Sequence, residues 1–125
     1  MIGTCLLVGG IVQAMLPGER FSIAWRHSVE KTRWEEHYAL SADRLVLEES
    51  RVEGFGAGME PPQGARLVDG TWRWRPDVAP LTEVRLTLSP YAGDYTVCWA
   101  GRCAPLRSLV EAPDIATVTL APCAG

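Results

Sequence analysis

Hydrophobic and polar residues alternate along most of the chain with a period of two, which is typical of half-buried β-strands. In residues 20–26, Phe21, Ile23 and Trp25 alternate with Ser22, Ala24 and the flanking arginines. Shorter segments with the same pattern follow at intervals of eight to twelve residues. The pattern therefore predicts an all-β protein.

A second alternating segment, residues 32–40, separates aromatic from charged side chains. Its apolar positions are Trp34, Tyr38 and Leu40. Its opposite, polar positions are Arg33, Glu35 and His37. Glu36 does not fit this alternation. The segment predicts a strand with one buried and one polar face.

Turn residues divide the rest of the chain into short strands. Asp69-Gly70 is typical of a tight hairpin turn, a second hairpin is expected at Ala100-Gly101, and residues 54–64 are rich in glycine and proline and predict a loop. Residues 106–112 are compatible with one short helical turn. We expect about eight or nine antiparallel strands in one domain, residues 20–125, folded as a β-sandwich or a partly closed barrel.

The first sixteen residues contain no charged side chain. The apolar run and the small residues before position 15 favour a secretory signal peptide cleaved after Ala14, although a basic leader is missing. The alternatives are a short membrane anchor and an ordinary buried first strand. We expect a signal peptide or anchor over residues 1–16.

The cysteines also favour export, because disulfides persist in oxidising compartments. Cys98 and Cys103 flank a four-residue hairpin loop and are the easiest pair to bridge. Cys123 is an alternative partner for either of them, so the connectivity stays open. Cys5 lies within the predicted leader.

The polar segment 25–38 contains both histidines of the protein, which raises the question of metal binding or catalysis. His27 and His37 lack the spacing of a zinc site. Ser28 follows His27 directly, and neighbours along a strand point to opposite faces, so His27 is badly placed to act as its base. We predict no metal, no cofactor and no enzymatic activity. The net charge of −3 does not indicate nucleic-acid binding.

Five motifs together resemble a known bacterial family. They are WRHSVEKTRWEEHY, GFGAGMEPP, DGTWRW, SPYAGDYTVCWAGRC and the terminal LAPC. The resemblance is to small exported proteins of unknown function, typically encoded beside, and sometimes fused to, TAXI-type TRAP transporter permeases. It spans Phe21 to Cys123, and its most specific parts are the run from His27 to Glu30 and the glycine-rich run from Gly56 to Met59.

The resemblance implies a non-catalytic accessory protein of a TAXI-type TRAP carboxylate transporter. Such a protein would dock on the permease or the solute receptor, in the periplasm or at the outer face of the inner membrane, with possible membrane association through the N-terminal segment. The alternative is a periplasmic domain that binds a small anion through His27, Lys31 or Arg33. We expect the opening strand to meet the glycine-rich loop, whose backbone amides would bond Ser28 and Glu30. The predicted binding residues are His27, Ser28, Glu30, Lys31, Arg33, Glu35, Gly56, Gly58 and Met59.

Overall fold

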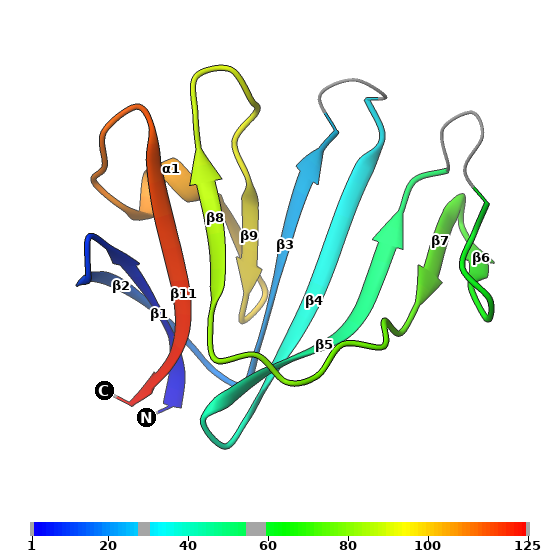
Figure 1. Ribbon diagram of the computed structural model, residues 1–125, viewed down its shortest axis with the longest axis horizontal. Coiled ribbons are helices and arrows are strands. Elements are labelled where there is room, and N and C mark those ends of the chain that lie inside the picture. Colours follow the sequence, from blue (N-terminus) through cyan, green and yellow to red (C-terminus); the bar gives the residue numbers. More distant parts are fainter. Residues whose placement is uncertain (1, 28–30, 55–59, 125) are drawn as a thin grey trace.

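Two antiparallel sheets pack face to face as a β-sandwich in the computed structural model, which describes residues 2–27, 31–54 and 60–124 (Figure 1). The smaller sheet has the strand order β2 (Ile11–Pro17), β1 (Ile2–Val8), β11 (Ala116–Ala124) and β8 (Val84–Leu88). The all-β prediction is confirmed, and of its two forms the sandwich is correct.

The larger sheet contains seven strands. Its order is β10 (Arg102–Pro105), β9 (Thr96–Trp99), β3 (Arg20–Arg26), β4 (Arg33–Ser41), β5 (Arg44–Val52), β7 (Thr71–Trp74) and β6 (Arg66–Val68). One short helix, α1 (Leu106–Leu109), follows β10 and corresponds to the expected helical turn. None of the helices in the described ranges is long and apolar enough to cross a membrane.

Residues 2–16, most of the segment expected as a signal peptide or anchor, belong to the smaller sheet. They form most of the hairpin β1–β2, which turns at Gly9-Gly10, and β1 pairs along its full length with β11. Leu6 and Leu16 are buried in the core. The two strands β1 and β2 bring the described strands to eleven rather than eight or nine.

Both predicted hairpin turns are present. Asp69 and Gly70 connect β6 to β7, and Ala100 and Gly101 connect β9 to β10. All four residues have positive φ angles, between 47° and 77°. Two successive residues in this left-handed region give a turn whose twist matches that of the paired strands.

Two disulfides join the described cysteines. Cys98–Cys103 bridges the β9–β10 hairpin, as expected. Cys5–Cys123 joins β1 to β11 across 118 residues of sequence. This pair was not predicted, because Cys5 was assigned to the leader. No described cysteine is free. Two disulfides are compatible with an oxidising compartment.

The core lies between the sheets. From the larger sheet it contains Phe21, Ile23, Tyr38, Leu45, Leu47 and Val97. From the smaller sheet it contains Leu6, Leu16, Leu86, Leu88, Val118 and Leu120. Because side chains alternate along each strand, the same strands that supply the core carry polar residues on their other face. On the larger sheet, that second face is the outer surface of the sandwich.

Candidate functional site

The outer surface of the larger sheet carries a group of charged side chains that we call the polar face. It consists of Ser22 on β3, Arg33, Glu35 and His37 on β4, and Glu49 and Arg51 on β5. The strand register sets Ser22 opposite His37, His37 opposite Glu49, and Glu35 opposite Arg51. Directly opposed residues of antiparallel strands share a face, so the six side chains form one continuous surface.

Ion pairs connect these side chains along the strands. The Glu35 carboxylate pairs with two side chains of the same strand. Arg33 Nε lies 3.4 Å from Glu35 Oε2, and His37 Nε2 lies 3.1 Å from Glu35 Oε1. Arg51 Nε donates to Glu49 Oε2 at 2.7 Å. The side chains of Glu35 and Glu49 are only 23% and 25% exposed, so these pairs are less screened than ordinary surface pairs.

The environment of Glu35 favours its charged form. Burial alone acts to raise the pKa of this carboxyl group. The hydrogen bond with His37 and the charges of Arg33 and His37 outweigh burial, so the pKa lies below its ordinary value. Glu35 is therefore a fixed negative charge at the centre of the polar face.

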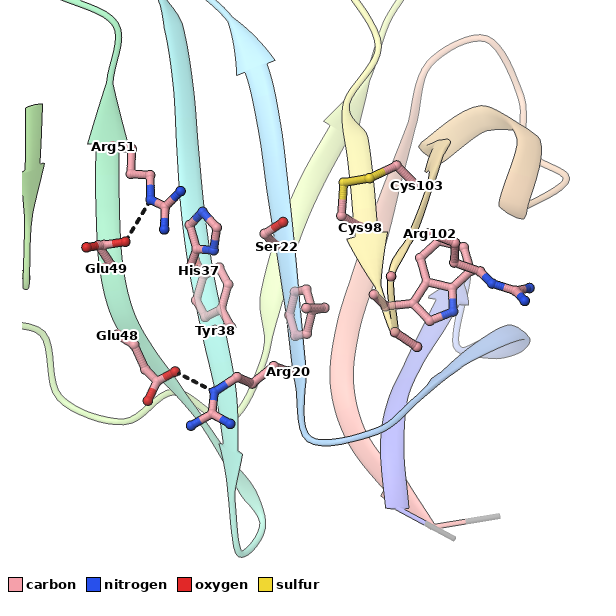
Figure 2. Close-up of a pocket in the computed structure, with 14 residues that line it drawn as sticks. Arg20, Ser22, His37, Tyr38, Glu48, Glu49, Arg51, Cys98, Arg102 and Cys103 are labelled. Atoms are coloured by element: carbon pink, nitrogen blue, oxygen red, sulfur yellow. Dashed lines mark hydrogen bonds and ion pairs between the residues drawn. A yellow bond between two sulfur atoms is a disulfide. The ribbon is translucent and has the colours of Figure 1, made fainter. Parts of the chain in front are cut away.

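Beside these pairs the surface is hollowed, as Figure 2 shows. The hollow has a volume of about 740 Å³ and is open to solvent. Ser22, His37 and the Cys98–Cys103 disulfide line it, and the ion pairs Glu49–Arg51 and Arg20–Glu48 stand at its side. Such an open, polar depression suits contact with another macromolecule better than enclosure of a small substrate.

A β-bulge places Glu48 at this hollow. The pairing of β4 with β5 shifts between His37 and Tyr38, which leaves Glu48 between the paired residues Leu47 and Glu49. Its carboxylate accepts a hydrogen bond from Arg20 Nε at 3.1 Å (Figure 2). Bulges commonly redirect a side chain in this way next to functional surfaces.

The opposite face of the same strands carries aromatic and aliphatic side chains and one carboxylate, that of Glu36. Trp25 and Trp34 are cross-strand partners whose rings stack with centroids 6.4 Å apart, and the Tyr95 ring is tilted against Trp25 at 6.0 Å. Glu36 lies on this face, opposite the fully buried Ile23 and beside the buried Ser50. It is the residue that did not fit the sequence pattern. We call Trp25, Trp34, Glu36, Tyr38 and Tyr95, with Trp72 and Trp74 of β7, the aromatic face.

Glu36 is held by one hydrogen bond, which Tyr38 Oη donates to its Oε1 at 3.0 Å. Burial raises the pKa of the Glu36 carboxyl group, and the bond from Tyr38 offsets this only in part. Burial and the nearby Glu36 also raise the pKa of Tyr38 and of Tyr95. Sequence reasoning noticed Glu36 only as an irregularity and did not assign it to a site.

The family comparison identifies which part of this structure is shared with other proteins. A family model described as "Domain of unknown function (DUF1850)" matches residues 21–106. The chain belongs to the DUF1850 family. The match covers the larger sheet together with β8, and it leaves out β1, β2 and β11 of the smaller sheet. It ends at residue 106, so it is shorter than the resemblance to Cys123 described above.

No curated protein and no solved structure matches the chain. Within the DUF1850 region lie both faces of β3–β5 and the Cys98–Cys103 disulfide, whereas both cysteines of the other disulfide lie outside it. The family description gives no activity, so any function must be argued from the two faces themselves.

The predicted binding residues fall into three groups. Arg33 and Glu35 lie together on the polar face, as described. His27 and Lys31 lie in the connection between β3 and β4, where Lys31 N donates to His27 O at 2.9 Å and Lys31 has a positive φ of 62°. Ser28, Glu30, Gly56, Gly58 and Met59 lie outside the described residues, and so does their expected meeting with one another.

The connection between β3 and β4 is stabilised by several bonds that the sequence did not predict. His27 N donates to Thr32 O at 2.8 Å, and Trp34 Nε1 donates to Thr32 Oγ1 at 3.2 Å. Arg26 Nη1 donates to Lys31 O. In the described ranges no group of three or more His, Cys, Asp or Glu side chains is arranged to hold a metal ion.

Proposed function

We propose that this DUF1850 domain is a non-catalytic accessory protein of a TAXI-type TRAP carboxylate transporter, and that it docks on the permease or the solute receptor through the polar face. The observation that carries the proposal is the extent of the family match. The shared region includes the larger sheet from Phe21 onward but only β8 of the smaller sheet. A function common to the family is then best sought on the larger sheet.

The charge arrangement of the polar face supports a docking role. Its carboxylates and guanidinium groups are half-buried, paired and attached to the two adjacent strands β4 and β5, so their positions are fixed before a partner arrives. Preorganised charges of both signs mainly increase the specificity of an interface and the rate of encounter, and they add less to its affinity. The link to the transporter comes from the resemblance of the motifs, and the two disulfides support a site of action outside the cytoplasm.

The experiment is to delete the gene in its host and measure uptake of solute through the neighbouring transporter. We expect uptake to fall and to return with the wild-type gene. A Glu35→Lys variant should restore it poorly and should co-purify less with permease or receptor, because the reversed charge faces Arg33 and Arg51.

The matched control is Glu83→Lys. Glu83 is also paired with an arginine, Arg85, but lies next to the smaller sheet, outside the polar face. Both variants are compared at equal amounts of folded protein, established by thermal melting. Unchanged uptake on deletion, combined with no co-purification with either transporter component, would refute the accessory role and favour the small-anion alternative.

A further inference from the structure

Glu36 occupies an unusual position for a carboxylate, since it lies on the inner side of the larger sheet. Its two cross-strand partners, Ile23 and Ser50, are 0% and 6% exposed. Along its own strand it lies between Trp34 and Tyr38, which project to the same side. The register of β5 with β7 adds Trp74 opposite Ser50. Apart from Ser50, the side chains around this carboxylate are therefore apolar or aromatic.

No positive charge compensates Glu36 among the residues that the structure describes. The ion pairs found there join other carboxylates, and the hydrogen bond to Glu36 comes from the uncharged hydroxyl of Tyr38. A partly buried carboxylate without a cationic partner costs free energy. The raised pKa of Glu36 is a consequence of that cost. An uncompensated charge of this kind is what a cationic ligand would satisfy.

The aromatic rings around Glu36 provide the second half of such a site. Trp25 and Trp34 stack side by side at an interplanar angle of 12°, and Tyr95 stands at 59° to Trp25. All three are half-buried and so keep part of their surface open to solvent. A small hollow of about 180 Å³ is lined by Trp25 and Tyr95 together with Arg26, His27, Thr87, Ala92 and Gly93, and neither Glu36 nor Trp34 is among its lining residues. Ring faces attract cations electrostatically, tryptophan most strongly.

We propose that the aromatic face binds a small organic cation, with an alkylated ammonium group held between the Glu36 carboxylate and the rings of Trp25, Trp34 and Tyr95. The carboxylate supplies the full negative charge, and the rings replace the weak hydration shell of the alkylated nitrogen. This site is on the opposite side of the sheet from the polar face and does not depend on the docking role.

Choline is a suitable probe, and its uncharged isostere 3,3-dimethylbutan-1-ol is the control ligand. Four of the five tryptophans (Trp25, Trp34, Trp72 and Trp74) belong to the aromatic face, so intrinsic fluorescence reports on it. With both disulfides intact, we expect choline to cause a saturable fluorescence change. The isostere should bind at least about tenfold more weakly, since the ring–cation attraction and the Glu36 charge are both lost.

Glu36→Gln should weaken choline binding by about tenfold or more while the fold is kept. Trp34→Leu is a second variant that removes a ring and leaves the charge. Glu49→Gln, which removes a carboxylate from the polar face, is the matched control and should bind choline like the wild type. Equal binding of choline and the isostere, an unchanged affinity of Glu36→Gln, or no saturable change with choline would each overturn the proposal.

Discussion

Glu35 and Glu36 are neighbours in the sequence and differ in almost every physical respect. Glu35 faces outward, where Arg33 and His37 lie within 3.4 Å and 3.1 Å of its oxygens and its pKa is lowered. Glu36 faces inward, where Tyr38 Oη is its hydrogen-bond donor and its pKa is raised. The pleat of one strand is enough to place identical side chains in opposite environments.

This difference shows how the two faces of one sheet can serve different purposes. On the polar face every carboxylate has a cationic partner, so its charges stabilise the fold and are available for specific contacts. On the aromatic face the charge destabilises the fold unless something binds it. A stability measurement can therefore distinguish the two faces without any knowledge of partner or ligand.

The largest effect is expected from the disulfides, of which Cys98–Cys103 lines the hollow beside the polar face and Cys5–Cys123 joins two strands of the smaller sheet. Chain-entropy estimates give about 5 kcal/mol for a crosslink as long as Cys5–Cys123 and about 2 kcal/mol for one as short as Cys98–Cys103. Cys5→Ala/Cys123→Ala should therefore lower the free energy of unfolding in urea more than Cys98→Ala/Cys103→Ala.

The contrary outcome would be equal stability of the two double variants. It would mean that the stabilisation by these disulfides does not follow the length of the loop that each one closes. Intact mass spectrometry of the wild-type protein without reduction supplies the control, since two disulfides lower the mass by four hydrogens. The same spectrum shows whether residues 1–16 are retained.

A smaller effect is expected when each glutamate is replaced by lysine. Glu36→Lys places a cation among aromatic and apolar groups with no carboxylate to pair with, which should cost about 2–3 kcal/mol. Glu35→Lys loses two ion pairs and faces Arg33 and Arg51, but the new charge lies near solvent, so its cost should be about 1 kcal/mol. Chemical denaturation of both variants at neutral pH measures the difference. If Glu35→Lys is the more damaging, the assignment of the two faces is wrong.

The sequence was sufficient for much of the fold, because period-two alternation and turn residues are local signals. Phe21, Ile23 and Trp25 lie on the inner side of β3 as their spacing predicts, and the turns at Asp69-Gly70 and Ala100-Gly101 have the expected left-handed residues. Strand β1 was assigned to a leader for a physical reason. A strand that is buried along most of its length has no polar positions to alternate with, so it resembles an apolar leader.

The candidate sites were predictable only in part. Arg33 and Glu35 were selected correctly as members of one surface, since residues two apart on a strand share a face. The roles of Ser22, Glu49 and Arg51 depend on the register of β3, β4 and β5, which no local pattern specifies. Glu36 did break the alternation, and that irregularity was the one available signal of the aromatic face. The position of Glu36 on the inner side of the sheet became clear only from its pairing with Ile23 and Ser50.

The smallest and most specific effect is expected from neutral replacements studied as a function of pH. Glu35 has a lowered pKa in the folded protein, so it adds stability above the unfolded pKa of about 4.5, and this is lost as the pH falls through the folded pKa. Glu36 has a raised pKa, so the unfolded chain ionises first and stability falls as the pH rises from about 4.5 through the folded pKa.

At pH 7, Glu35→Gln should therefore be less stable than the wild type, by about 1 kcal/mol or less. Glu36→Gln should be more stable, and both differences should shrink toward pH 3. Melting temperatures from pH 3 to pH 8 test this. Two variants that change stability in the same direction at pH 7 would show that the adjacent glutamates do not occupy opposite environments.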